Sequence, residues 1–114
     1  MFRGETVELL VPRVTYDANK DEVVTWEPYT VHGVLFDSPD TDDVDGAMRL
    51  HGVHAQFATH WPKSFDGSLR GCRIHRLRDG RTYTIAGDPQ PYPPENCPRH
   101  IPWNRKAIAG WVDG

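Results

Sequence analysis

The chain has 114 residues, a formal net charge of -3 and a hydrophobic content of 38%. This length suits one domain, and the negative balance argues against an overall basic field that would attract nucleic acid. No run approaches the ~20 apolar residues of a membrane span. Arg3, Glu5 and Glu8 interrupt the apolar core that a signal peptide needs, so we expect an intracellular protein in which Cys72 and Cys97 stay reduced.

Ten glycines and ten prolines disfavour long helices and favour short strands with long connections. Three strands are expected early in the chain, over residues 6–16, 22–27 and 29–36. Pro28 is expected to separate the second strand from the third, while Pro12, which lacks an amide donor, indicates either a sheet edge or the end of pairing. Gly33 permits a bend or a bulge within the third strand.

An acidic segment over residues 37–46 breaks this strand pattern. It carries five aspartates, namely Asp37, Asp40, Asp42, Asp43 and Asp45. Little in the segment can contribute to a core, so a solvated or disordered loop is expected. Loose binding of a cation by these carboxylates is the alternative.

The second half of the chain contains the strongest local signal, a β-hairpin over residues 71–87. Asp79-Gly80 is typical of a two-residue type I′ turn, which would place Leu77 opposite Thr82. One face of the hairpin is then apolar, and the stem of one arginine extends it. The members of this face are Cys72, Ile74, Tyr83, Ile85 and the stem of Arg76.

The remaining elements complete an all-β expectation. A strand is predicted over residues 50–61, and six of the ten prolines fall in 88–102, which should run extended without secondary structure. Residues 104–112 favour a last strand over a short helix. The sequence therefore predicts a single all-β domain over 1–114, a small antiparallel β-barrel or sandwich with long loops and an extended proline-rich C-terminal arm at 88–103.

Metal binding and catalysis are the readings that the sequence supports least. The histidines and cysteines suggest a zinc site built from His51, His54, His60 and Cys72, but structural zinc normally needs two closely spaced ligand pairs. The only close pair containing a cysteine is Cys97 with His100. The EF-hand frame that starts at Asp17 lacks its glycine and glutamate. No serine lies in a nucleophile elbow, so we expect no catalysis and no cofactor.

Basic and aromatic residues in the second half are candidates for a protein interface. A surface of this kind would suit an acidic protein neighbour or a phosphate backbone without base readout. Tryptophans near the end of the chain suit the pocket of a neighbour, because aromatic residues dominate binding hot spots. The candidate interface residues are Arg73, Arg76, Arg78, Arg81, Trp103 and Trp111.

The order of these features resembles a known family. The opening TVELLVPRVTYDANKDEV is followed by YTVHGVLF, the acidic segment and AQFATHWPKSFDGSLRGCRIHRLRDGRTYTIAGDPQPY. Within it, the pattern dGxxYxIxGxP is matched by Asp79-Gly80, Tyr83, Ile85, Gly87 and Pro89. The chain resembles the head-to-tail connector proteins of tailed bacteriophages, in particular the small stopper, or head-completion, proteins of long-tailed phages.

The resemblance implies a structural protein of the virion, made in the host cytoplasm and placed in the phage neck. Copies would form a cyclic ring that closes the DNA channel below the portal and adaptor proteins and receives the tail terminator or tail tube. The segment 37–46 would face the channel, where its aspartates would repel DNA as it passes. The alternatives are another joining protein, of adaptor or tail-terminator type, and a small metal-binding β-domain.

Overall fold

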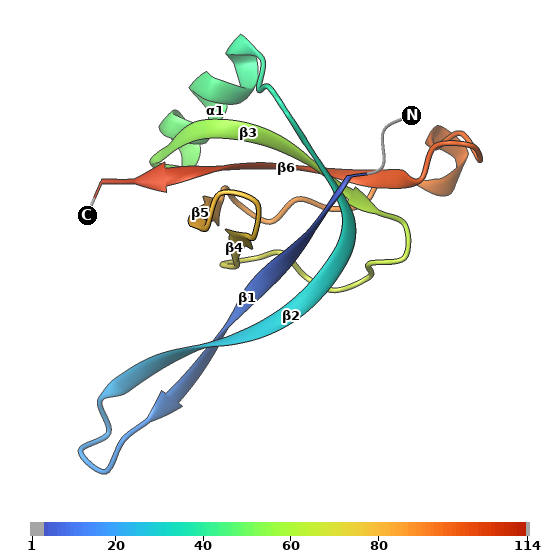
Figure 1. Cartoon of the computed structure of the whole chain (residues 1–114). Helices are drawn as coiled ribbons and strands as arrows, with labels where there is room; N and C mark the ends of the chain where they lie inside the picture. The colour runs from blue at the N-terminus through green and yellow to red at the C-terminus, as the bar shows by residue number, and fades with distance from the viewer. Residues whose placement is uncertain (1–3, 114) are drawn as a thin grey trace.

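The computed structural model describes residues 4–113, so Arg3 lies outside the described residues. Six antiparallel strands close into a barrel in the order β1-β2-β3-β6-β5-β4 (Figure 1). This confirms the predicted all-β fold and selects a barrel over a sandwich. The elements are β1 Glu5–Tyr16, β2 Glu22–Asp37, α1 Thr41–His51, β3 Val53–Pro62, β4 Arg73–Arg76, β5 Arg81–Ile85, a 3₁₀ turn at Pro94–Asn96 and β6 Trp103–Val112.

The inward-facing side chains of the barrel strands form one core. Val7 and Leu9 of β1 are buried, and Val11 packs against them, as the alternation in the sequence predicted. Trp61 is fully buried on β3, where its indole N–H donates to Thr59. The other buried members are Val31, Val34, Leu69, Cys72, Ile74, Tyr83, Ile85, Ala107 and Ala109.

Strands β1 and β2 form a two-stranded ribbon that extends away from the barrel (Figure 1). The predicted break at Pro28 is wrong, because β2 is continuous and Pro28 pairs with Leu10. β2 pairs with β3 only over 35–37, so no third strand of the described chain lies beside Pro28. The missing amide of Pro28 therefore costs no hydrogen bond to such a strand. Gly33, with a φ of 83°, lies beside the register shift between β1 and β2, which confirms the predicted bulge.

The predicted solvated loop at 37–46 is also wrong. Asp37 ends β2, Asp40 caps the helix and 41–51 form α1. The side chain of Asp40 accepts the Asp43 amide at 2.7 Å while the Asp43 side chain accepts the Asp40 amide, which is a reciprocal capping box. Gly52 ends the helix in the left-handed region. The aspartates therefore start a helix instead of solvating a loop.

The β4–β5 hairpin has the predicted faces but a different register. Arg76 pairs with Arg81, so a four-residue loop over 77–80 replaces the predicted two-residue turn. A type I′ turn needs two positive φ angles, and in this loop only Gly80 has one. The true register differs from the predicted one by two residues, which keeps every side chain on its predicted face. Cys72, Ile74, Tyr83 and Ile85 are accordingly all buried.

The proline-rich segment connects β5 to β6 and contains only the short 3₁₀ turn at Pro94–Asn96. Lys63 donates from its ammonium to the Pro98 carbonyl at 3.0 Å, which ties this segment to the end of β3. The chain then re-enters the sheet as β6, between β3 and β5. The predicted last strand is therefore confirmed.

Candidate functional site

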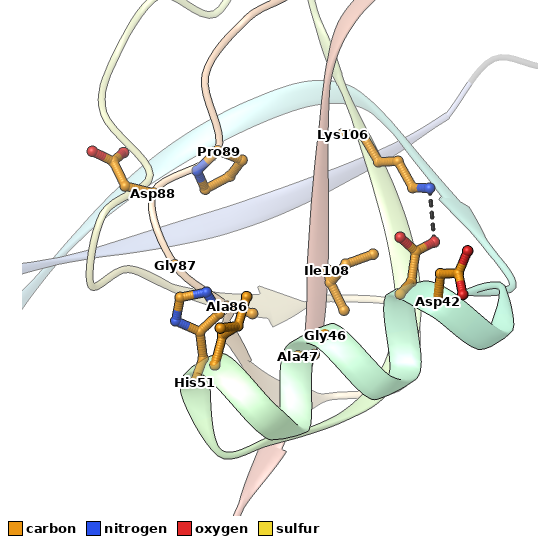
Figure 2. Close-up of a pocket in the computed structure, with 12 residues that line it drawn as sticks. Asp42, Gly46, Ala47, His51, Ala86, Gly87, Asp88, Pro89, Lys106 and Ile108 are labelled. Atoms are coloured by element: carbon orange, nitrogen blue, oxygen red, sulfur yellow. Dashed lines mark ion pairs between the residues drawn. The ribbon is translucent and has the colours of Figure 1, made fainter.

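The aspartates of α1 divide into two groups with different surroundings. Asp43 lies 2.7 Å from the Lys106 ammonium on β6, and this ion pair is the dashed line that starts at Lys106 in Figure 2. Asp42 and Asp45 are exposed and share one surface of the helix with Met48 and Arg49, and Asp42 also borders the groove described below. Asp40 is used as the cap, and Asp37 lies 3.8 Å from the His60 ring on β3. Within the described chain, the free negative charge of α1 therefore lies mainly on Asp42 and Asp45.

The titration of Asp43 reflects its place between helix and barrel. Burial alone would raise the pKa of its carboxyl, but Lys106 and the Asp40 amide stabilise the charged form and bring the pKa below its usual value. The same contact raises the pKa of Lys106. Both groups are therefore charged at neutral pH, and the pair joins α1 to β6.

A groove of about 350 Å³ lies between α1 and the segment that follows β5 (Figure 2). Ala47 and Ile108 line its apolar part, and His51 stands at the end nearest Gly87. A Cβ at Gly87 would lie 2.8 Å from the His51 ring, so the helix end and this segment are tightly fitted. The groove includes three carboxylates, from Asp42, Asp43 and Asp88, but Asp43 is already paired with Lys106.

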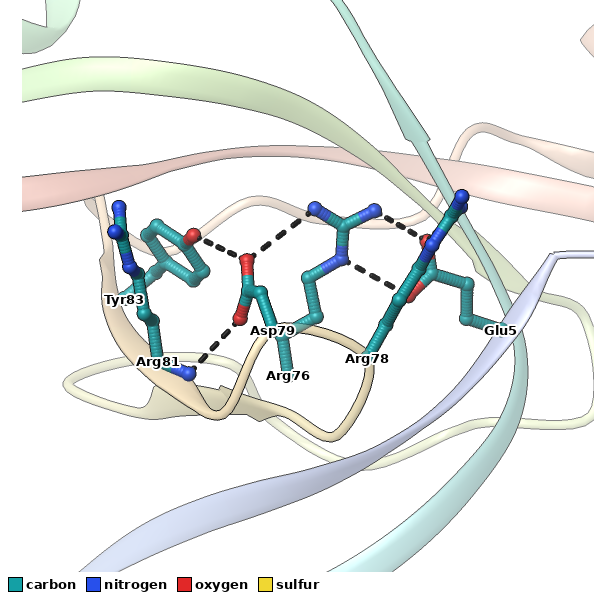
Figure 3. A network of polar contacts seen from close by, with 6 residues as sticks. All are labelled: Glu5, Arg76, Arg78, Asp79, Arg81 and Tyr83. Atoms are coloured by element: carbon teal, nitrogen blue, oxygen red, sulfur yellow. Dashed lines mark hydrogen bonds and ion pairs between the residues drawn. The ribbon is translucent and has the colours of Figure 1, made fainter.

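Arg76 is the centre of a polar network on the inner face of the β4–β5 hairpin, where its side chain is only 12% exposed (Figure 3). Its guanidinium donates to both carboxylate oxygens of Glu5, at 2.9 and 2.6 Å, and so joins β4 to the start of β1. The Glu5 contact raises the pKa of Arg76 further above its usual value. The guanidinium also lies over Phe36, at 4.3 Å from the ring centre. Arg76 therefore stabilises the barrel through contacts inside the fold and is not free to bind a neighbouring protein.

Asp79 completes this network from the hairpin loop. It accepts the Tyr83 hydroxyl at 2.6 Å and the Arg81 amide at 2.8 Å, which fixes the loop (Figure 3). Burial opposes the charge of Asp79, but these donors and Arg76 bring its pKa below the usual value. Asp79, which the sequence identified only as a turn residue, is thus also the acceptor for several hydrogen bonds of the hairpin.

The other predicted interface residues differ in how much surface they offer. Arg78 and Arg81 are exposed, and the Arg78 side chain is 76% accessible. Trp103 instead donates its indole N–H to the Gly33 carbonyl at 2.7 Å, so it secures the bulge of β2. Trp111 is 49% exposed and stacks on His54. Of the six predicted residues, Arg73, Arg78, Arg81 and Trp111 lie on the surface, while Arg76 and Trp103 are used within the fold.

The predicted zinc ligands lie apart from one another. His54 pairs with Asp113, His60 lies near Asp37, and His51 lines the groove beside Gly87. Cys72 is buried in the core, and burial raises the pKa of its thiol. Among residues 4–113, no group of three or more histidine, cysteine, aspartate or glutamate side chains is placed to hold a metal ion.

Sequence reasoning missed an apolar surface on one face of the ribbon, which is exposed toward the far end of the ribbon. Pairing of Pro12 with Trp26 and of Val14 with Val24 puts these side chains on the same face. Arg73 of β4 lies on that face too, 4.3 Å from the Trp26 ring centre. We call it the ribbon face, and its apolar members are Leu10, Pro12, Val14, Tyr16, Val24, Trp26 and Pro28. The sequence signal for this face was the alternation of apolar residues on both sides of Pro28. The expected strand break at Pro28 obscured it.

The opposite face of the ribbon is mainly polar. Arg13 and Glu27 form an ion pair at 2.6 Å there, and Arg13 also donates to the Tyr29 hydroxyl. The ribbon therefore has one apolar and one mainly polar face. Where it extends beyond the barrel, neither strand pairs with a further strand of the described chain.

A second missed feature is a buried charge. Arg105 of β6 is 5% exposed, and one guanidinium nitrogen donates to the Gly67 carbonyl at 2.7 Å. Burial lowers its pKa from the usual value. This bond ties the loop between β3 and β4 over the end of the barrel.

No family model matches the chain, and a search of curated proteins found no match. Within residues 4–113, no helix is both long and apolar enough to cross a membrane.

Proposed function

We propose that this protein is a structural subunit of the neck of a tailed phage, a stopper that forms a ring, closes the DNA channel and joins the portal and adaptor to the tail. It acts without catalysis. The single observation that carries the proposal is the ribbon, which projects from a complete barrel and leaves an apolar face and two free edges.

The ribbon is incomplete as a free-standing element. Beyond Leu10 of β1 and before Leu35 of β2, the two strands pair only with each other among the described residues. A two-stranded sheet is marginally stable at best in water, and free edges invite pairing with other chains. Val14 and Tyr16 are 52% and 70% exposed at its far end. A permanent place in an assembly would cover these groups.

The corrected structure of 37–46 changes how the acidic residues would act in a channel. Asp40 and Asp43 are needed to start α1, so Asp42 and Asp45 on its outer side are the charges available to face DNA. Carboxylates repel the phosphate backbone, which would let DNA pass without adhering. Closure of the channel would then depend on steric blockage by the ring.

The proposal is tested by removing the protein from the phage that encodes it, through a stop codon in its gene. The expected products are heads that package DNA, fail to retain it and carry no tail, with recovery when the chain is supplied from a plasmid. Virions of normal form and infectivity without the chain would overturn the proposal.

A binding experiment separates the proposed role from the two related ones. The purified chain is added to portal rings, to portal–adaptor complexes and to isolated tail tubes, and each mixture is sedimented. A stopper binds the portal–adaptor complex and not the portal alone. An adaptor would bind the bare portal, and a tail terminator would bind only the tube, so either result contradicts the stopper role.

The channel charge has its own test. Asp42→Asn and Asp45→Asn remove the exposed charges and leave the capping residues in place. We expect slower DNA ejection from virions with the double variant, because the lumen then repels DNA less. Unchanged retention and ejection would remove the charge from the mechanism.

A further inference from the structure

We infer that the ribbon face of one copy of this chain docks on the outer surface of helix α1 of a second copy. The inference deepens the proposed function. Only the closure of the copies into a ring rests on that function, because the contact itself is argued from this chain's surfaces. It begins from the positions of the large hydrophobic side chains that the barrel leaves exposed.

Five of the twelve large hydrophobic side chains that are exposed in the described chain fall on two separate surfaces. On the ribbon face, Val24 is 45% exposed, and Val14 and Tyr16 are more so. On α1, Val44 and Met48 are each 41% exposed. These two are four residues apart, so they are neighbours on the helix surface. Two different apolar surfaces on one chain fit a head-to-tail contact between identical copies, which is the type of contact that generates rings.

The charges that border these surfaces have complementary signs. The ribbon face has Arg73 over Trp26 at its barrel end and Glu22 opposite Tyr16 at its far end. The outer side of α1 has Asp42 and Asp45 toward its start and Arg49 in its last turn. If the helix lies along the ribbon with its start at Arg73, each charge meets one of the opposite sign. Two ribbon faces packed antiparallel would also bring Arg73 near Glu22, so a product between two Val24→Cys chains is the rival outcome in the experiment below.

The spacing of the charges also agrees. Glu22 lies four residues along β2 from Trp26, which is about 13 Å of strand. Asp42 and Arg49 lie seven residues apart in α1, which is about 10 Å of helix. The long side chains of Arg73 and Arg49 can take up the difference. A helix that lies along the two-stranded sheet would also supply the layer that the ribbon lacks.

The inference is tested by directed cross-linking of the full chain. Val24→Cys is placed in one preparation and Met48→Cys in another, both with Cys97→Ser, while Cys72 stays buried in the core. The two are mixed with a short bismaleimide. We expect a Val24→Cys to Met48→Cys product at least about tenfold above the product from Thr25→Cys, whose side chain lies on the opposite ribbon face.

Charge reversal adds a rescue. Arg73→Glu on the Val24→Cys chain should lower the yield about tenfold, because like charges then meet. Asp42→Lys with Asp45→Lys on the Met48→Cys chain should lower it similarly, and the two reversed chains together should restore it. Glu22→Lys and Arg49→Glu form a second pair with the same logic, in case the first pair weakens α1, which circular dichroism would report.

The outcomes separate the inference from the proposed function. Equal cross-linking of Thr25→Cys and Val24→Cys, or a dominant product between two Val24→Cys chains, would overturn this interface. Loss of yield without rescue by the paired reversal would overturn the charge alignment. A chain that is required for the neck yet gives no Val24→Cys to Met48→Cys product would keep the proposed function and exclude this contact.

Discussion

Asp43 of α1 lies 2.7 Å from the Lys106 ammonium of β6, and this pair holds the acidic helix against the barrel. Asp43 also closes the capping box with Asp40. One carboxylate therefore starts the helix and fixes where it packs.

Replacement of Asp43 by alanine should lower the free energy of unfolding by about 1 kcal/mol, because a cap bond and an ion pair are lost together. Urea denaturation at neutral pH measures the change. The matched control is Asp45→Ala, which removes an exposed charge from the same helix. The pKa of Asp43 is lowered in the folded state, so its contribution is present above the unfolded pKa of about 3.9 and disappears as pH falls through the folded value. Equal effects of both variants would contradict this account.

Arg76 and Glu5 should be strongly coupled, since their side chains are only 12% and 20% exposed. Arg76→Met is expected to cost about 2–3 kcal/mol of stability, because Glu5 loses its partner in a partly buried place. A double-mutant cycle with Glu5→Gln should give a coupling energy of about 1–2 kcal/mol. Arg78→Met, at an exposed arginine 3.9 Å from Glu5, should change stability by less than about 0.5 kcal/mol. Additive effects in the cycle would mean that the ion pair does not join β4 to β1.

Gly46→Ala tests whether the acidic segment is a helix. Gly46 lies within α1, and a Cβ there meets nothing within 4 Å. Alanine should therefore raise stability by about 1 kcal/mol through its greater helix propensity. Gly80→Ala is the matched control, because its surroundings are also open but its φ is +70°, and it should destabilise by about 1 kcal/mol. No gain from Gly46→Ala would favour the loop that the composition predicts.

His60 should make stability depend on pH. Burial lowers its pKa in the folded state, and nearby Asp37 only partly opposes that effect. A lowered histidine pKa gives a stability contribution that is present above the unfolded value of about 6.5 and is lost as pH falls through the folded value. His60→Gln should flatten the stability profile between about pH 7 and pH 5. His100→Gln, at an exposed histidine of the proline-rich segment, serves as the control, and an unchanged slope in His60→Gln would contradict the assignment.

The hairpin illustrates how far local sequence reaches. The alternation of Cys72 and Ile74 with polar residues predicted which side chains are buried, because a strand has a period of two. The register still came out two residues away from the expected one, because Asp79 bonds Tyr83 and Arg81 across the loop. The alternation of apolar and polar residues determined the faces of this hairpin, and contacts between side chains determined its pairing register.

Alternation of apolar residues predicted the core face of β1, the series of short strands predicted an all-β domain, and Gly110 with the β-branched Ile108 and Val112 predicted the last strand. Only the tertiary structure decided that 41–51 is helical and that β2 continues through Pro28. The caps of α1, formed by Asp40 with Asp43 and by Gly52, are local signals that the acidic composition of 37–46 obscured, whereas the packing of α1 and the path of β2 depend on partners distant in the sequence. α1 packs through Asp43 on Lys106, and the amide that Pro28 lacks is not needed where β2 has no neighbour on its second edge.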